Sequence, residues 1–204
     1  CTGSSQSFTI TVNPTPQVND LPDQVVCNSS STATLAFTGT GTAYSWVNTT
    51  PSIGLIANGS GNIAAFTATN TGITAVSSTI TVTPQYLNAG VTCSGSTQTI
   101  GITVNPTPTV TDPADLVVCN GSATSAVNFT GTGTTYTWVN SNPAIGLGAS
   151  GSGNITTFNA INNGTTPVVA TITVTPNFTG AGINCTGTPQ TFTITINPTP
   201  TAND

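Results

Sequence analysis

The sequence predicts an all-β protein, made of tandem β-sandwich domains of about seven strands each in a rod-like array. Three observations predict it. The chain matches itself at an offset of 92 residues. Its apolar residues alternate with threonine at a period of two, as in strands with one buried and one exposed face. An Asn-Pro-Thr-Pro segment, whose prolines end a strand, recurs with the repeat.

The repeat defines the domain size. FTITVNPTP at Phe8–Pro16 returns as IGITVNPTP at Ile100–Pro108 and as FTITINPTP at Phe192–Pro200. Residues 1–92 and 93–184 agree at 54 of 92 positions without an insertion. A period of this length is the size of a small domain with its own core, not of a solenoid repeat.

The alternation predicts the strands. β-branched threonine suits the exposed face, and the apolar residues between the threonines suit the core. Asn58-Gly59 and Asn163-Gly164 are expected to form tight turns. The strands expected in the first repeat are Gln17–Cys27, Ala33–Thr38, Ala43–Val47, Gly54–Ala57, Ile63–Ala68, Thr74–Thr83 and Thr97–Val104. The aromatic residues expected in the core are Tyr44, Trp46, Tyr136 and Trp138.

Proline sets the domain boundaries, because it has no amide hydrogen for a sheet ladder and stiffens an extended chain. Residues 15–106 and 107–198 then form two complete repeats. Residues 1–14 are the last strand of a preceding repeat, and residues 199–204 begin a following one. Short proline linkers favour a semi-rigid array over a flexible one. The predicted hinge residues are Asn13, Pro14, Pro16, Asn105, Pro106, Pro108, Asn197, Pro198 and Pro200.

The cysteines recur with the repeat: Cys27 matches Cys119, and Cys1 matches Cys93 and Cys185. Such recurrence in a charge-poor chain of secreted character predicts disulfides. Two pairings fit the period, Cys27–Cys93 with Cys119–Cys185 inside the repeats, or Cys1–Cys27 with Cys93–Cys119 across the hinges. We prefer the first, because a domain usually closes its own cross-link; Cys1 then bonds to the preceding repeat.

Charged side chains are nearly absent: the chain has no Lys, Arg, His or Glu, and its only charged residues are five Asp. Without cationic side chains the chain cannot neutralise phosphate, which argues against nucleic acid and anionic lipid as partners. No apolar run is long enough for a membrane span. Acid–base chemistry would rest on Asp alone, so we do not expect an enzyme.

Two kinds of binding site deserve weighing against simpler explanations. Oxygen-rich hinges can hold Ca²⁺ between domains, although Asp also favours turns. No cofactor is expected, and calcium is the alternative. The carboxylates that follow the hinges are Asp20, Asp23, Asp112 and Asp115. Thr-X-Thr arrays at Thr79–Thr83 and Thr191–Thr195 are of the kind that can bind ice, but threonine is also the ordinary residue of an uncharged exposed strand face.

Several segments together resemble a known family. VCNGS, FTGTGTTYTWVN and CTGTPQTFTITINPTP, in this order from Val118 onward, resemble the PKD-like repeats of very long surface proteins of Bacteroidota. The resemblance covers nearly the whole chain. It implies an immunoglobulin-like β-sandwich, export across the outer membrane, commonly by the type IX system, and adhesive or fibrous roles. One departure is that Trp46-Val47-Asn48 stands where better-known PKD domains carry an acidic turn, so properties of that turn do not carry over.

These observations lead us to expect a structural extracellular module: part of a semi-rigid, disulfide-stapled stalk or filament at or beyond the bacterial cell surface. The absence of Lys and Arg removes every trypsin-type cleavage site. The expected partners are further copies of the same repeat in one chain and laterally associated chains. The alternative is an adhesin that binds carbohydrate or a protein partner through the sandwich loops.

Overall fold

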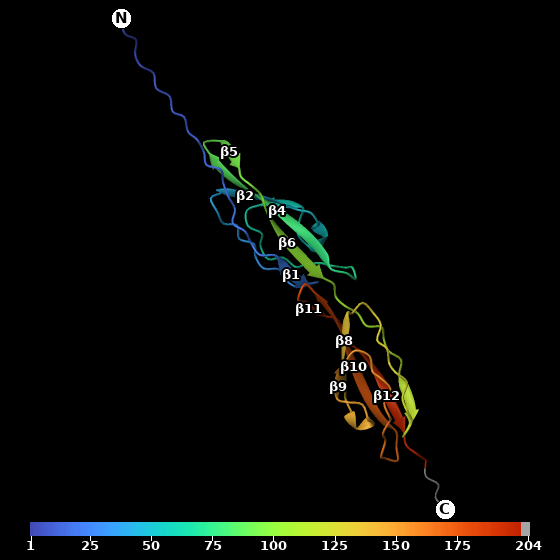
Figure 1. Cartoon of the computed structure of the whole chain (residues 1–204). Helices are drawn as coiled ribbons and strands as arrows, with labels where there is room; N and C mark the ends of the chain where they lie inside the picture. The colour runs from blue at the N-terminus through green and yellow to red at the C-terminus, as the bar shows by residue number, and fades with distance from the viewer. Residues whose placement is uncertain (201–204) are drawn as a thin grey trace, which may run out of the picture. The chain divides into compact units, whose positions relative to one another are not determined.

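A computed structural model describes residues 1–200 and shows an all-β protein (Figure 1). The chain divides into two compact units, which are described separately below. The first comprises Cys1–Thr69 and Ser77–Thr103, and the second comprises Asn70–Val76 and Val104–Asp204. Most of the segment 199–204, predicted to begin a further repeat, lies outside the described residues.

The first unit is organised around one six-stranded sheet with the order β1-β6-β4-β2-β3, in which β5 also pairs with β4. The short helix η1 (Pro51–Ile53) follows β2. Trp46 of β2 lies opposite Val82 of β4. The strands are β1 (Gln24–Cys27), β2 (Ala43–Asn48), β3 (Asn58–Ser60), β4 (Val76–Asn88), β5 (Val91–Ser94) and β6 (Gln98–Asn105).

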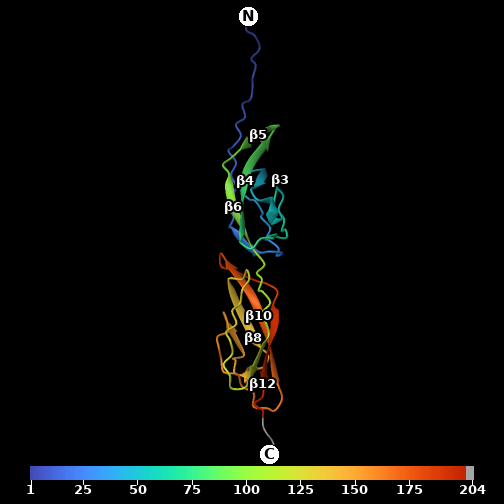
Figure 2. The same cartoon turned by 90° about the vertical axis from the view of Figure 1, so that its right-hand side faces the viewer.

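The second unit repeats this order as β7-β12-β10-β8-β9, again with a hairpin strand, β11, on the long central strand β10. Figure 2 shows β10 together with β8 and β12. β12 pairs antiparallel with β10 and parallel with β7. The elements are β7 (Leu116–Cys119), β8 (Thr135–Asn140), η2 (Pro143–Ile145), β9 (Ser150–Ser152), β10 (Val168–Gly180), β11 (Ile183–Thr186) and β12 (Gln190–Asn197).

The layer that faces this sheet consists of segments joined by isolated bridges, such as Val127 with Ile155, and not of regular strands. Side chains replace part of the missing ladder: Asn154 Oδ1 accepts a hydrogen bond from the Phe129 amide at 2.9 Å. Asn and Thr side chains compete in this way for backbone hydrogen bonds and interrupt regular strands. The expected sandwich is therefore confirmed, but its second layer is less regular than the predicted seven strands.

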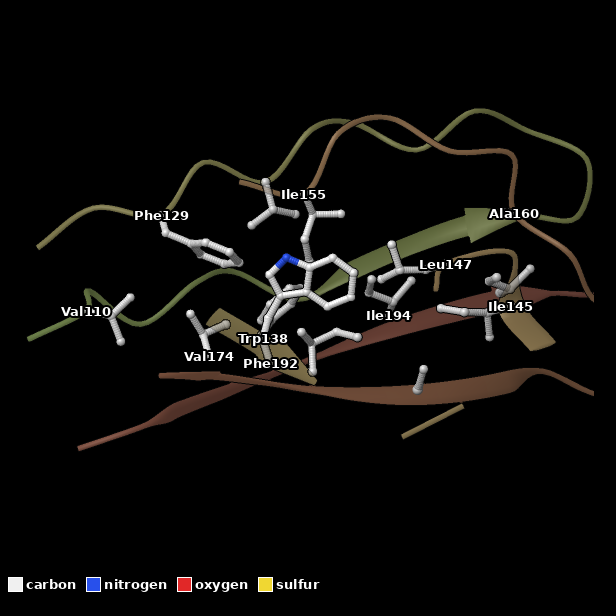
Figure 3. Close-up of a cluster of buried hydrophobic side chains, with 14 residues drawn as sticks. Val110, Phe129, Trp138, Ile145, Leu147, Ile155, Ala160, Val174, Phe192 and Ile194 are labelled. Atoms are coloured by element: carbon white, nitrogen blue, oxygen red, sulfur yellow. The ribbon is translucent and has the colours of Figure 1, made fainter. Parts of the chain in front are cut away.

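The core of the second unit lies between the sheet and these bridged segments (Figure 3). Phe129, Ile155 and Ala160 come from the bridged layer, while Phe192 and Ile194 come from β12. Phe192, Ile194 and the neighbouring Ile172 are at most 2% exposed. Burial of these alternating apolar residues supplies the main drive for the two layers to associate.

Individual strand predictions differ in accuracy. Ala43–Val47 and Thr97–Val104 agree closely with β2 and β6. The strand expected at Gly54–Ala57 is wrong, because Gly54 has a φ of 99° and ends the helix η1. The strand expected at Gln17–Cys27 is shorter, and covers only its last four residues as β1. The hairpin strand β5 has no counterpart among the predicted strands.

The tight turn predicted at Asn58-Gly59 is also wrong, because both residues belong to β3. Glycine is needed there for another reason. A Cβ on Gly59 would lie 2.2 Å from Cζ2 of Trp46, so the indole ring occupies the space of a side chain. Gly151 of β9 lies in the same way against Trp138. The Asn-Gly pair therefore reports a close approach of an aromatic ring to a strand and not a turn.

Candidate functional site

The predicted hinge Asn105–Pro108 is anchored tightly on the second unit. Pro106 and Pro108 are buried. The Asn105 side-chain amide donates hydrogen bonds to the carbonyls of Gly180 at 2.9 Å and Ile183 at 3.3 Å, at the β10–β11 turn. A Cβ on Gly187 would lie 1.8 Å from the Pro108 carbonyl oxygen, which only glycine permits. The hinge thus has a defined contact with the domain that follows it in the sequence.

The corresponding segment Asn13–Pro16 contacts the first unit in the same manner. Asn13 Oδ1 accepts a hydrogen bond from the Asn88 side chain at 2.7 Å. Pro16 is buried, and a Cβ on Gly95 would lie 1.8 Å from its carbonyl oxygen. Pro14, in contrast, is exposed. Both units therefore hold the second proline of the Asn-Pro-Thr-Pro segment against a glycine.

The third copy of the hinge motif follows β12. Asn197 and Pro198 are half-buried, and Pro200 is exposed. The Asn197 carbonyl accepts a hydrogen bond from the Asn120 amide at 2.9 Å. This contact continues the pairing of β12 with β7 by one residue beyond Cys119.

Two of the four candidate calcium ligands have a structural role where the first strand of a unit lies beside its last strand. Asp115 Oδ1 accepts a hydrogen bond from the Thr193 amide at 2.6 Å, and Asp23 Oδ1 accepts one from the Gly101 amide at 2.6 Å. The hydrogen bond from the Thr193 backbone, followed by that from the Thr193 hydroxyl, holds the pKa of the Asp115 carboxyl below its ordinary value of 3.8. Each carboxylate therefore fixes the register of the last strand against the first strand of its unit.

The other two candidates, Asp20 and Asp112, are exposed. Asp112 lines an open depression of about 280 Å³ in the second unit, together with Leu116, Val127 and Asn128. No group of three or more His, Cys, Asp or Glu side chains that could hold a metal ion lies within residues 1–200. The carboxylates are therefore dispersed within each unit.

The predicted disulfides inside the repeats, Cys27–Cys93 and Cys119–Cys185, are wrong. Cys1, Cys93 and Cys119 are free thiols, which also contradicts the alternative pairing across the hinges. Cys27 and Cys185 are disulfide-bonded.

The sheet register explains why a repeat cannot close its own disulfide. Cys185 lies opposite Phe178 of β10, whereas Cys119 lies opposite Asn197, just beyond the pair Val168–Ile196. Ten residues along β10 separate these two levels, which corresponds to about 33 Å. A disulfide requires Cα atoms within about 7 Å. The second repeat therefore carries its two cysteines at opposite ends of one sheet.

The four aromatic residues predicted for the core occupy two environments. Trp46 and Trp138 are buried, at 6% and 8% exposed. Tyr44 and Tyr136 are half-buried and pack their rings on phenylalanine, Tyr44 at 5.8 Å from Phe37. None of the four forms an exposed stacking platform for a sugar ring.

The outer face of the second sheet is a threonine-rich surface. Thr171 pairs with Thr193, and Thr173 pairs with Thr191. Thr175 of β10 lies opposite Thr137 of β8. These residues are exposed or half-buried, in agreement with the expected threonine face. Val117 and Val139, at 66% and 59% exposed, add apolar area to the same face of neighbouring strands.

Buried asparagines are the polar feature that the sequence analysis missed. Asn162 is 3% exposed, and its side-chain amide donates to the carbonyls of Thr166 at 2.9 Å and Ile196 at 2.8 Å. Its Oδ1 accepts a hydrogen bond from the Gly164 amide at 2.9 Å. Asn140 likewise donates to Leu147 and Gly148. The signal was present in the sequence, because both asparagines recur 92 residues apart, as Asn48 and Asn70 in the first repeat.

Comparison with known proteins gives no family. No protein-family model matches the chain, and no curated protein matches it. Among solved structures, human protocadherin-24 EC1-2 is similar at 12% identity over 93% of this chain and 100% of that chain, with a TM-score of 0.43. Drosophila N-cadherin EC1-4 is similar at 12% identity over 90% of this chain and 50% of that chain, with a TM-score of 0.44. The insect immune protein hemolin is similar at 13% identity over 90% of this chain and 47% of that chain, with a TM-score of 0.36. Similarity at this level supports no argument about function.

Proposed function

We propose that the chain is a structural extracellular module, a stretch of a semi-rigid stalk or filament at or beyond a bacterial cell surface. The observation that carries this proposal is the repetition of one architecture without insertion. Both units have the same strand order, with the last strand between the first strand and the long central strand. A chain that repeats one domain at constant spacing is suited to spanning distance.

The anchored hinge segments support a semi-rigid array. Each Asn-Pro-Thr-Pro segment has a restricted backbone because of its prolines. In two of the three segments the carbonyl of the second proline, Pro16 or Pro108, lies against a glycine of the domain that follows. Such a linker has fewer accessible conformations than a Gly/Ser linker of the same length. Further copies of the repeat on either side of this segment are the partners that we propose.

The composition suits an exposed extracellular position. The absence of Lys and Arg leaves no cleavage site for trypsin-like proteases. The outer sheet face carries threonine and valine without any charge, so neighbouring chains would meet little electrostatic repulsion on lateral association. Within residues 1–200, no helix is long and apolar enough to cross a membrane. We infer a non-catalytic role without a resident cofactor, and calcium binding at the dispersed carboxylates is the alternative.

A second candidate function is that of an adhesin. The observation in its favour is the depression in the second unit, where the carboxylate of Asp112 and the amide of Asn128 lie beside the apolar Leu116 and Val127. Carboxylate and amide groups next to an apolar wall are the kind of lining that binds a sugar. Glycan-array binding that is lost in Asp112→Ala would favour this function.

Small-angle scattering of the chain tests the structural proposal. Replacing Pro106 and Pro108 by glycine is expected to broaden the distribution of particle dimensions, because glycine restores backbone freedom to the linker. A Pro113→Gly variant, which changes a proline outside the hinge, is the control. Equal flexibility in all three proteins would refute a role for the hinge prolines.

Electron micrographs of the native material should show filaments with a regular axial repeat of about 35–50 Å, the length of one sandwich and its hinge.

A further inference from the structure

The N-terminal segment Gln6–Asn13 has the sequence of a core strand but no strand partner. It is extended and unpaired in the structure, where it runs as the blue trace of Figure 1. Its apolar side chains face solvent: Phe8 is 85% exposed, Ile10 is 76% exposed and Val12 is 87% exposed. Three large apolar residues in this alternation are costly to leave in water.

The same sequence forms an interior strand of the second unit. From Phe8 to Pro14 the segment is identical to Phe192–Pro198, except that Val12 stands for Ile196. In β12 the three apolar positions are 2%, 0% and 0% exposed. Two identical side chains and one conservative replacement are thus at most 2% exposed in β12 and 76–87% exposed in the N-terminal segment. The difference is the presence of a partner and not the chemistry of the strand.

The position of β12 specifies that partner. β12 pairs on one side with β10 and on the other with β7, so both of its backbone edges are used. Its Phe192 belongs to the core cluster drawn in Figure 3, with its ring centroid 6.4 Å from that of Phe129. A strand with this inward pattern therefore fits an interior gap in a sheet better than an exposed edge, where only one side of its backbone would pair.

We propose that Gln6–Asn13 is a docking strand for a repeat of this same type, filling the interior gap between the counterparts of β7 and β10. The repeat that receives this strand is the one that precedes it in the same polypeptide. This inference rests on the proposed tandem array and deepens it. Each repeat would be completed by the chain segment that also leads into the next domain, which couples the fold of one domain to the linker that follows it.

The register of this docking follows from β12. Thr9 corresponds to Thr193, whose amide donates to Asp115, so Thr9 pairs with the equivalent carboxylate of the receiving repeat. Ile10 then lies opposite the counterpart of Leu116, as Ile194 does. A slip of one residue would turn the apolar residues to the outer face, which makes this register specific.

A shortened chain tests the proposal directly. Ending the chain after Gly187 removes β12 and leaves the docking strand, so each molecule has both a strand and a gap. We expect concentration-dependent oligomers in light scattering, with the docking strand of one copy in the gap of the next. Ile10→Asp should weaken association about 100-fold, because it places an unpaired carboxylate in the core. Ser4→Asp, which lies outside the strand, is the matched control.

A second measurement covers the case in which the shortened chain folds poorly. A synthetic peptide of residues 5–14 is added to the shortened chain that carries Ile10→Asp in a Trp46→Phe background, and Trp138 fluorescence is followed. Recovery of a buried-tryptophan spectrum with this peptide, but not with the Ile10→Asp peptide, supports the proposal. Absence of recovery, or oligomers that are insensitive to Ile10→Asp, overturns it.

Further measurements test where the receiving gap comes from and distinguish failure of strand docking from failure of the stalk function. The intact chain, whose gap is filled by β12, should remain monomeric, and Ile10-dependent association of intact chains would overturn an interior docking site. In native material, one long polypeptide supports a preceding repeat, whereas separate short chains joined end to end refute it. A flexible, irregular native fibre would refute the stalk function without affecting strand capture.

Discussion

Replacing Asn162 by alanine is expected to destabilise the second unit by about 3 kcal/mol. The change removes three side-chain hydrogen bonds, to the carbonyls of Thr166 and Ile196 and from the amide of Gly164. Each contributes about 0.5–1.5 kcal/mol net, and the buried carbonyl of Ile196 loses a donor that water cannot easily replace. The loss is a large fraction of the stability of a small domain, which is about 5–15 kcal/mol.

Urea unfolding followed by tryptophan fluorescence measures this loss. A Trp46→Phe background in every sample leaves Trp138 as the reporter of the second unit, because the chain contains two Trp residues. With a slope of about 1.5 kcal/mol/M, the midpoint should fall by about 2 M. Asn163→Ala is the matched control, since this neighbouring side chain is exposed. It should change stability by less than about 0.5 kcal/mol.

A variant that keeps one of the three contacts sharpens the test. Asn162→Asp retains the acceptor for the Gly164 amide but removes both donors and brings a carboxylate against two carbonyl oxygens. It should be at least as destabilising as alanine at neutral pH. If Asn162→Ala lowers stability by less than about 1 kcal/mol, or no more than Asn163→Ala does, the buried asparagine is not a structural cross-link and the reasoning fails.

Three other predictions concern single contacts. Gly151→Ala should lower stability by about 2 kcal/mol, because its Cβ would lie 2.3 Å from the Trp138 ring, whereas Gly148→Ala, with its nearest contact at 3.8 Å, should be near neutral in thermal melts. Gly187→Ala should destabilise the unit by about 2 kcal/mol and speed hydrogen exchange at the hinge, because its Cβ would lie 1.8 Å from the hinge carbonyl; unchanged exchange would contradict the anchoring. The lowered folded pKa of Asp115 gives stability that is present above the unfolded value of 3.8 and is lost as the pH falls through the folded value, so acid titration should show this loss in the native chain and not in Asp115→Asn.

The fold class could be predicted from the sequence because its signals are local and repeated. Alternation at β2 and β6 places every second residue in the core, and the 92-residue offset shows that both domains use the same pattern. The second layer could not be predicted to the same accuracy. Its pairing depends on which Asn and Thr side chains take backbone hydrogen bonds, as Asn154 does with Phe129, and this depends on contacts between residues distant in the sequence.

The disulfides show the same limit of local reasoning. Spacing alone fits Cys119–Cys185, but only the register of β7, β12 and β10 reveals that these residues lie at opposite ends of the sheet. The roles of the four candidate calcium residues could not be predicted for a similar reason. Asp115 precedes a strand whose neighbour comes 78 residues later, so its role in binding the Thr193 amide cannot be read from the residues around it. At Gly59 a strong local signal predicted a turn, but the glycine belongs to a strand and is needed because the Trp46 ring lies against it.

The place of β12 between β7 and β10 has a consequence for how such a domain is made. The first and last strands of the unit are neighbours, yet Asp115 and Thr193 are separated by 78 residues of chain. A domain emerging N-terminus first from a ribosome cannot close its sheet until its final eight-residue strand has appeared. Folding dominated by such long-range pairs is slow. Each domain would therefore acquire its compact form only after its last strand has appeared, one domain at a time and in sequence order.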